Sequence, residues 1–172
     1  MEVDTELLAS VIEFSIGLAG FAGVVVVFLK RTSLFQSVEK FRLINLILTS
    51  IGPAFLSFLA IILERLLRGS DAAALSSCAL LASYMVMLTL RAFLARKRFS
   101  SSEMAQVNPK FFLAMFVLGT SNLCLQVVAA FGVFGSHTFT VFYIGLVALL
   151  AMGVSQFVIS IMGGFGATES ES

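Results

Sequence analysis

Long apolar runs alternate with short polar segments along the whole chain. The five runs cover residues 7–29, 43–63, 73–94, 111–134 and 139–162. A transmembrane helix takes about 20 consecutive, mostly apolar residues, and each run reaches that length. The pattern predicts an all-α membrane protein, a bundle of five transmembrane helices that forms one domain over residues 1–163. The composition of residues 164–172, which include Glu169 and Glu171 and few large apolar side chains, predicts that they form a disordered acidic tail.

The two flanks of the first run add further expectations. Acidic residues precede it, whereas a cleaved signal peptide begins with a basic segment and has a shorter apolar stretch. We therefore expect this helix to stay in the mature protein. After the run, residues 33–42 place Leu34, Val38 and Phe41 on one helical face. This segment fits either a helix on the cytoplasmic membrane surface or an extension of the second span.

Lysine and arginine gather in two of the four loops. The first loop contains Lys30, Arg31, Lys40 and Arg42, the third contains Arg96, Lys97, Arg98 and Lys110, and the second contains only Arg65 and Arg68. Short loops rich in lysine and arginine stay on the cytoplasmic side during insertion. The sequence therefore predicts an outer N-terminus and a cytoplasmic C-terminus with its tail.

Composition removes several classes of protein. Hydrophobic residues make up 59% of the 172 residues and charged residues only 12%, which excludes a soluble enzyme domain. The formal net charge of +1 gives no sign of a clustered basic face, so we expect no nucleic-acid partner. Cys78 and Cys124 lie inside apolar runs and form no CxxC pair, which favours packing roles for both.

The first span contains a carboxylate, Glu13, six residues from its outer end. At 1.5 Å per residue, this position is roughly 9 Å below the membrane boundary. A charged side chain there is costly, and such residues commonly mark functional sites. Gly17 and Gly20 share its helical face, and Gly23 ends a row of small residues on the adjoining face, which predicts close packing against another helix. A structural and a functional role for Glu13 both stay open.

Other polar residues fall into two layers when each helix is given its predicted direction. The outer layer, near the depth of Glu13, contains Ser57, Ser76, Ser77, Gln126 and Tyr143, and the inner layer contains Asn45, Thr49, Arg91, Gln156 and Ser160. In the outer layer, Gln126 and Tyr143 are expected to hydrogen-bond the Glu13 carboxyl. Arg91 lies too far inward for that and is expected to extend toward the cytoplasmic surface.

Two spans contain residues suited to a polar pathway. Asn122 lies four residues before Gln126, and Pro53 lies in the middle of the second span. Proline frees the carbonyl of Thr49 and bends a helix, because it has no N–H group to donate. These residues predict either a water-lined ion pathway with Pro53 as its hinge or ordinary hydrogen bonds that join helices.

Residues for membrane-enzyme chemistry are missing from the spans. His137 is the only histidine and lies in a predicted loop, so no histidine pair can hold haem and no histidine and carboxylate cluster marks a metal site. Every lysine lies in a loop, and Ser155 lacks both the following glycine and the histidine base of a serine hydrolase. We expect no enzymatic activity, no cofactor and no metal.

The first two spans carry a pattern that extends beyond single residues. It reads E-x-x-I-x-x-A-G-F-A-G-V-V-V-V-F from Glu13, followed by a basic loop and FRLINLILTSIGPAFLSFLA. This pattern resembles an uncharacterised family of small bacterial multi-span proteins, with a weaker similarity in YIGLVALLAMGVSQFVISI of the fifth span. The resemblance implies a bacterial inner (plasma) membrane setting and singles out Glu13, Gly20 and Gly23, but it implies no activity.

Two functions fit these features. In the first, copies of the chain assemble around a symmetry axis and conduct an ion or proton, with Glu13 as the coordinating or proton-carrying group. The pore would lie between subunits, because five spans enclose little space. In the second, the protein is an accessory or scaffold subunit whose glycine face binds another membrane protein. The expected partners are accordingly the lipid bilayer, further copies of the chain, or an unlike membrane protein.

Overall fold

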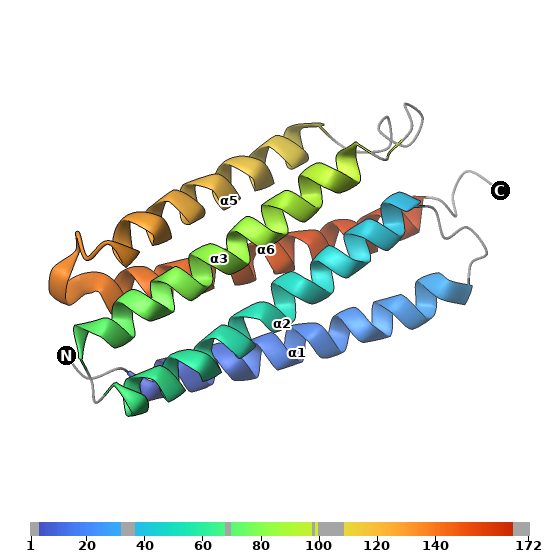
Figure 1. Ribbon diagram of the computed structural model, residues 1–172. Helices are drawn as coiled ribbons and strands as arrows, with labels where there is room; N and C mark the ends of the chain where they lie inside the picture. The colour runs from blue at the N-terminus through green and yellow to red at the C-terminus, as the bar shows by residue number, and fades with distance from the viewer. Residues whose placement is uncertain (1–3, 32–36, 68–69, 98, 100–108, 167–172) are drawn as a thin grey trace.

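The computed structural model describes residues 4–31, 37–67, 70–97, 99 and 109–166 (Figure 1). These residues form five long α-helices and a short 3₁₀ turn, without a strand. The helices are α1 (Thr5–Arg31), α2 (Ser37–Leu66), α3 (Asp71–Arg96), α5 (Pro109–Ala130) and α6 (Thr138–Gly166), and the turn is η1 (Gly135–His137). All five helices are long and apolar enough to cross a membrane, which confirms the predicted all-α, five-helix architecture.

Some helix ends differ from the predicted spans. The sequence predicts the fourth helix up to residue 134, but α5 ends at Ala130. Gly132 and Gly135 have φ angles of 78° and 51°, a left-handed conformation that suits glycine and interrupts helical structure. α6 continues to Gly166, three residues into the predicted tail, and residues 167–172 lie outside the described part of the chain. From Ser37 onward the segment before the second span is an extension of α2.

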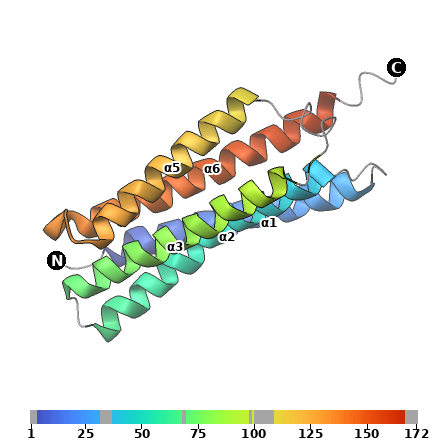
Figure 2. The ribbon, with the colours of Figure 1, turned by 45° about the horizontal axis from the view of Figure 1, so that its top comes forward.

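Helix α6 lies at the centre of the bundle. It packs against α1, α2, α3 and α5, whereas α1 packs mainly on α2 and to a lesser extent on α6. α3 packs on α2 and α5. Two views show α1 and α5 on opposite sides of the bundle, and successive helices run antiparallel (Figures 1 and 2). α1 is therefore a peripheral helix with few neighbours.

Apolar side chains fill the interior and also cover the outside. The largest fully buried side chains include Leu46, Leu81, Met85, Phe142, Leu146 and Leu149. On the outside, Phe21 of α1, Phe55 of α2 and Leu113 of α5 are 65%, 59% and 61% exposed. Surfaces in contact with water rarely expose large continuous apolar areas. This exterior matches the hydrocarbon region of a bilayer, as expected for five membrane-spanning helices.

Candidate functional site

Helix α1 has one buried side and one exposed side. The buried side consists of Leu8, Val11, Ser15, Leu18 and Ala22. The exposed residues of α1 include the row Glu6, Ser10, Glu13, Gly17 and Gly20, which we call the outward face of α1. Other exposed residues of the helix are apolar, among them Phe14 and Phe21. Both rows recur at intervals of three and four residues, and helical geometry places them about half a turn apart. Glu13 therefore lies on the side of α1 that faces away from the bundle.

The glycines of α1 have open space around them. A Cβ atom added to Gly17, Gly20 or Gly23 would meet no heavy atom within 4 Å. The sequence predicts that these glycines pack against a neighbouring helix, and no helix in the described part of this chain does so. Their surface is thus open to a helix from outside the chain.

The two side chains expected to bind Glu13 have other partners. Gln126 is fully buried, and its Nε2 donates a hydrogen bond of 2.9 Å to the carbonyl oxygen of Val141. Tyr143 Oη donates to the carbonyl oxygen of Asp4 over 3.4 Å. The predicted bonds to Glu13 are therefore not formed. The three residues have similar depths, but Gln126 lies between α5 and α6, whereas Glu13 lies on the outer side of α1.

The remaining residues of the predicted polar cluster serve helix packing. Asn122 Nδ2 donates a hydrogen bond of 3.1 Å to the carbonyl oxygen of Gly145, across the contact between α5 and α6. Ser77 Oγ donates to the carbonyl oxygen of Ala73 in its own helix at 2.8 Å. Ser57 is buried, and its Oγ has no hydrogen-bond partner among the described residues. The bonded members of this layer thus serve separate local contacts, and only the two amides join α5 to α6.

Three glycines that the sequence analysis does not single out permit the closest contacts between helices. Each faces a polar side chain of a neighbouring helix: Gly52 faces Tyr84, Gly145 faces Gln126, and Gly153 faces Thr49. A Cβ atom on Gly52, for example, would lie 2.6 Å from Tyr84 Oη. Pro53, the predicted hinge, follows Gly52 and is buried within α2, which continues as a helix on both sides of it. Isolated glycines opposite polar groups therefore position the central helices.

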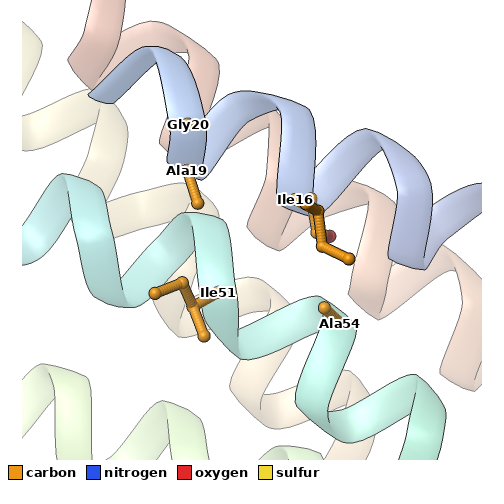
Figure 3. A pocket seen from close by; sticks show the side chains of 6 residues that line it. Ile16, Ala19, Gly20, Ile51 and Ala54 are labelled. Carbon is orange, nitrogen blue, oxygen red and sulfur yellow. The ribbon is translucent and has the colours of Figure 1, made fainter. Parts of the chain in front are cut away.

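A groove of about 370 Å³ lies between α1 and α2, beside the outward face (Figure 3). Its lining consists of Ser15, Ile16, Ala19, Gly20, Ile51 and Ala54. Ser15 supplies the only side-chain polar atom of this lining, and its Oγ is buried without a hydrogen-bond partner in the described part of the chain. The groove is thus an apolar depression that borders the outward face at Gly20.

Metal binding has no support from the described side chains. They contain no group of three or more His, Cys, Asp or Glu residues placed to hold an ion.

Comparison with protein-family models, with curated proteins and with solved structures finds no match, so the resemblance to a family of bacterial multi-span proteins stays a prediction. The candidate site therefore rests on the geometry of α1.

Proposed function

We propose that this protein is a homo-oligomeric, channel-like membrane protein in which the α1 helices of several copies line a pathway for an ion or proton. The observation that carries the proposal is the position of Glu13 on the outward face of α1, within a segment long and apolar enough to span a membrane. A carboxylate exposed to lipid costs about 2.5 to 3.5 kcal/mol at the bilayer centre and less at the shallower depth of Glu13. Water and polar groups between adjacent copies would remove that cost.

The spacing of the outward face supports contact between α1 helices. From Glu6 to Gly20 its residues alternate at intervals of four and three, which is the repeat of helices that cross in a left-handed pair. Gly17 and Gly20 leave room for a second backbone to approach closely. In the outer half of this face the residues are polar (Glu6, Ser10 and Glu13), and in the inner half they are small (Gly17 and Gly20). A ring of these helices would surround a narrow path that begins at carboxylates.

The interior of the bundle favours a pathway between copies over one through a single copy. Phe142, Leu146 and Leu149 are buried at its centre, and close-packed cores leave few voids larger than a water molecule. The amides of Asn122 and Gln126 are bonded to the backbone of α6. Polar groups inside the bundle are thus used to join helices, whereas the Glu13 carboxylate is accessible from outside.

Charge at the two ends of the bundle supports an outer N-terminus and a cytoplasmic C-terminus. α2 begins, α3 ends and α5 begins at one end of the bundle, whereas α1 begins, α2 ends and α3 begins at the other (Figure 1). By these bounds, the first end carries Lys40, Arg42, Arg96, Lys97 and Lys110, and the second carries Asp4, Glu6, Glu64, Arg65 and Asp71. The strongly basic end is expected to stay in the cytoplasm. This orientation places Glu13 in the outer half of a bacterial inner membrane.

An accessory or scaffold subunit of a larger membrane complex is the second candidate function. The groove between α1 and α2 favours it, because a depression lined by Ile16, Ala19 and Ile51 can accept a bulky apolar side chain from an unlike helix. Copurification of the full chain with a stoichiometric, unlike membrane protein would support this function over the channel.

Ion and proton flux into proteoliposomes of the purified protein tests the channel proposal. Under an imposed potential or pH gradient, we expect flux well above that of empty vesicles, a large loss in Glu13→Gln, and partial retention in Glu13→Asp. Asp71→Asn is the matched control, because it removes an exposed carboxylate in the first turn of α3, outside the proposed pathway. Flux that Glu13→Gln leaves unchanged, or no flux from folded protein, would overturn the channel function.

A further inference from the structure

The backbone of α2 is weakened in the middle of the helix. Pro53 has no N–H group to donate to the carbonyl oxygen of Thr49, and its ring crowds that carbonyl. Just before it, Thr49 Oγ1 and Ser50 Oγ donate to backbone carbonyl oxygens of the preceding turn, over 2.9 and 2.7 Å. Hydroxyls that bond the backbone in this way often bend helices. Residues 49–53 are therefore the segment at which α2 bends most easily.

Tyr84 of α3 lies against this segment. Its Oη donates a hydrogen bond of 2.7 Å to the carbonyl oxygen of Leu48. The hydroxyl reaches this carbonyl because Gly52 has no side chain, since a Cβ atom there would lie 2.6 Å from the same oxygen. In a membrane, neighbouring helices satisfy the backbone groups that a proline disturbs, because lipid tails offer no hydrogen bonds. Tyr84 thus joins α3 to the backbone of α2 at its weakened segment.

The groove between α1 and α2 lies on the side of α2 away from Pro53. Ile51 and Ala54 line the groove (Figure 3), and at 100° per residue the midpoint between them is roughly 130° around the helix from Pro53. A proline bends a helix away from its own side, because its ring pushes against the preceding turn. On that side, Thr49 faces Gly153 of α6. Bending of α2 is thus directed away from α6, toward the groove and α1.

The outer half of α2, residues 54–66, lies beside the part of α1 that contains Glu13. The two helices run antiparallel (Figure 1), and Ile16 of α1 lies opposite Ala54 across the groove (Figure 3). Glu13 precedes Ile16 by three residues, so its turn of α1 runs alongside the residues that follow Ala54. Because α1 packs mainly on α2, a movement of the outer half also moves this turn.

We propose that Tyr84 is a latch on a hinge at residues 49–53 of α2. While its hydrogen bond is formed, the outer half of α2 stays against α3. When the bond is broken, the outer half bends into the groove and displaces the turn of α1 that carries Glu13. Tyr84 is thus a positioning residue that regulates the pathway through α2 and α1. This regulation rests on the proposed channel function, whereas the latch itself does not.

Distances between two spin labels in the full chain test the latch. After Cys78 and Cys124 are replaced by alanine, labels are placed at Leu66→Cys and Phe131→Cys, which are 73% and 83% exposed near the outer ends of α2 and α5. The labelled chain is diluted with unlabelled chain in nanodiscs, so that only distances within one copy are measured. Because α1 and α5 lie on opposite sides of the bundle, bending toward α1 lengthens this distance.

Tyr84→Phe keeps the ring beside Gly52 and removes only the hydroxyl. We expect it to raise the population of the longer distance by about fivefold, the usual effect of one lost hydrogen bond. A second label pair, Lys40→Cys and Lys110→Cys, reports on the basic end of the bundle and should keep its wild-type distance. Equal lengthening at both ends would indicate general loosening of the bundle and would overturn the latch.

Two further variants separate the latch from an ordinary loss of packing. Ser83→Ala is the matched control, because it removes a neighbouring hydroxyl of α3 that bonds its own helix, at the carbonyl oxygen of Ala79. It should change neither distance. Pro53→Ala restores the missing N–H group, and in this background Tyr84→Phe should no longer lengthen the outer distance.

Three other results would overturn the latch: an unchanged outer distance in Tyr84→Phe, the same lengthening in Ser83→Ala, or full lengthening in the absence of the proline. The two proposals fail separately. Lengthening in Tyr84→Phe of a chain that conducts nothing would remove the channel function and leave the latch. Flux that depends on Glu13, with distances that Tyr84→Phe leaves unchanged, would do the reverse.

Discussion

Gln126 Nε2 on α5 lies 2.9 Å from the backbone carbonyl oxygen of Val141 on α6. Asn122, one turn earlier on α5, bonds the carbonyl oxygen of Gly145 in the same way. These amides therefore recognise the backbone of α6 and not its side chains. Because lipid tails are as apolar as the outer surface of α5, such bonds and close packing hold this helix in place without a hydrophobic driving force.

Replacement of Gln126 by methionine is expected to weaken the contact between α5 and α6. The free energy of unfolding should fall by about 1 kcal/mol, the typical value of a hydrogen bond between membrane helices. Thermal unfolding in a mild detergent, followed by circular dichroism, measures the loss. Cys124→Ala is the control, because Cys124 is exposed on the same helix. Equal stability of Gln126→Met and the control would show that the bond contributes nothing.

Gly145→Ala is expected to destabilise the bundle far more than Gly20→Ala. A Cβ atom on Gly145 would lie 2.6 Å from Leu81 Cδ2 and would also overlap the Gln126 amide, whereas one on Gly20 would meet nothing within 4 Å. Overpacking of this kind costs about 1 to 3 kcal/mol. The melting temperatures of the two variants in monodisperse detergent samples give the comparison. A loss of stability in Gly20→Ala as large as that in Gly145→Ala would contradict this account.

The helices can be predicted from the sequence because an apolar run of about 20 residues has few alternatives in a membrane. Their ends are harder to predict. Residues 131–134 are apolar enough to extend α5, but the left-handed backbone at Gly132 interrupts it. Hydropathy does not register such a backbone preference, so the predicted helix is too long by four residues.

The candidate site could be predicted only in part, because sequence gives depth more readily than orientation. Glu13, Gln126 and Tyr143 have similar depths, but their hydrogen bonds depend on which side of each helix faces the bundle. In a soluble protein, the polar side of a helix is the side that faces water. In a membrane, the protein core and the lipid are equally apolar, so hydropathy does not show which side of a helix faces the bundle. The row of glycines in α1 has the spacing of a helix contact, although the isolated glycines Gly52, Gly145 and Gly153 are the ones that permit close contacts between helices.

Bulky substitutions on the outward face of α1 are expected to weaken self-association while leaving the fold intact. Gly17→Ile and Gly20→Leu place side chains into space that is open within the chain, so their melting temperatures should stay close to that of the wild type. A second α1 could no longer approach closely, and dissociation should increase by about tenfold or more, since small residues are required at such contacts. Sedimentation in density-matched detergent measures the mass of the oligomer and its dissociation.

The matched control for self-association lies on the opposite side of the bundle. Val128 of α5 is 41% exposed, and Val128→Leu adds bulk without affecting α1. It should leave the oligomer unchanged. An oligomer that survives both glycine variants would place the interface elsewhere and would also remove the basis for a pathway lined by Glu13.

The orientation of the chain can be tested at the turn between α5 and α6. Ser136 is exposed in η1, at the same end of the bundle as Asp71 and opposite the basic end with Lys97. After Cys78 and Cys124 are replaced by alanine, Ser136→Cys should react with a membrane-impermeant maleimide added outside intact bacterial cells or spheroplasts. Lys97→Cys should react only after the membrane is permeabilised. The reverse pattern would place Glu13 in the cytoplasmic half, so a proton entering from outside would reach the small residues of α1 before the carboxylate.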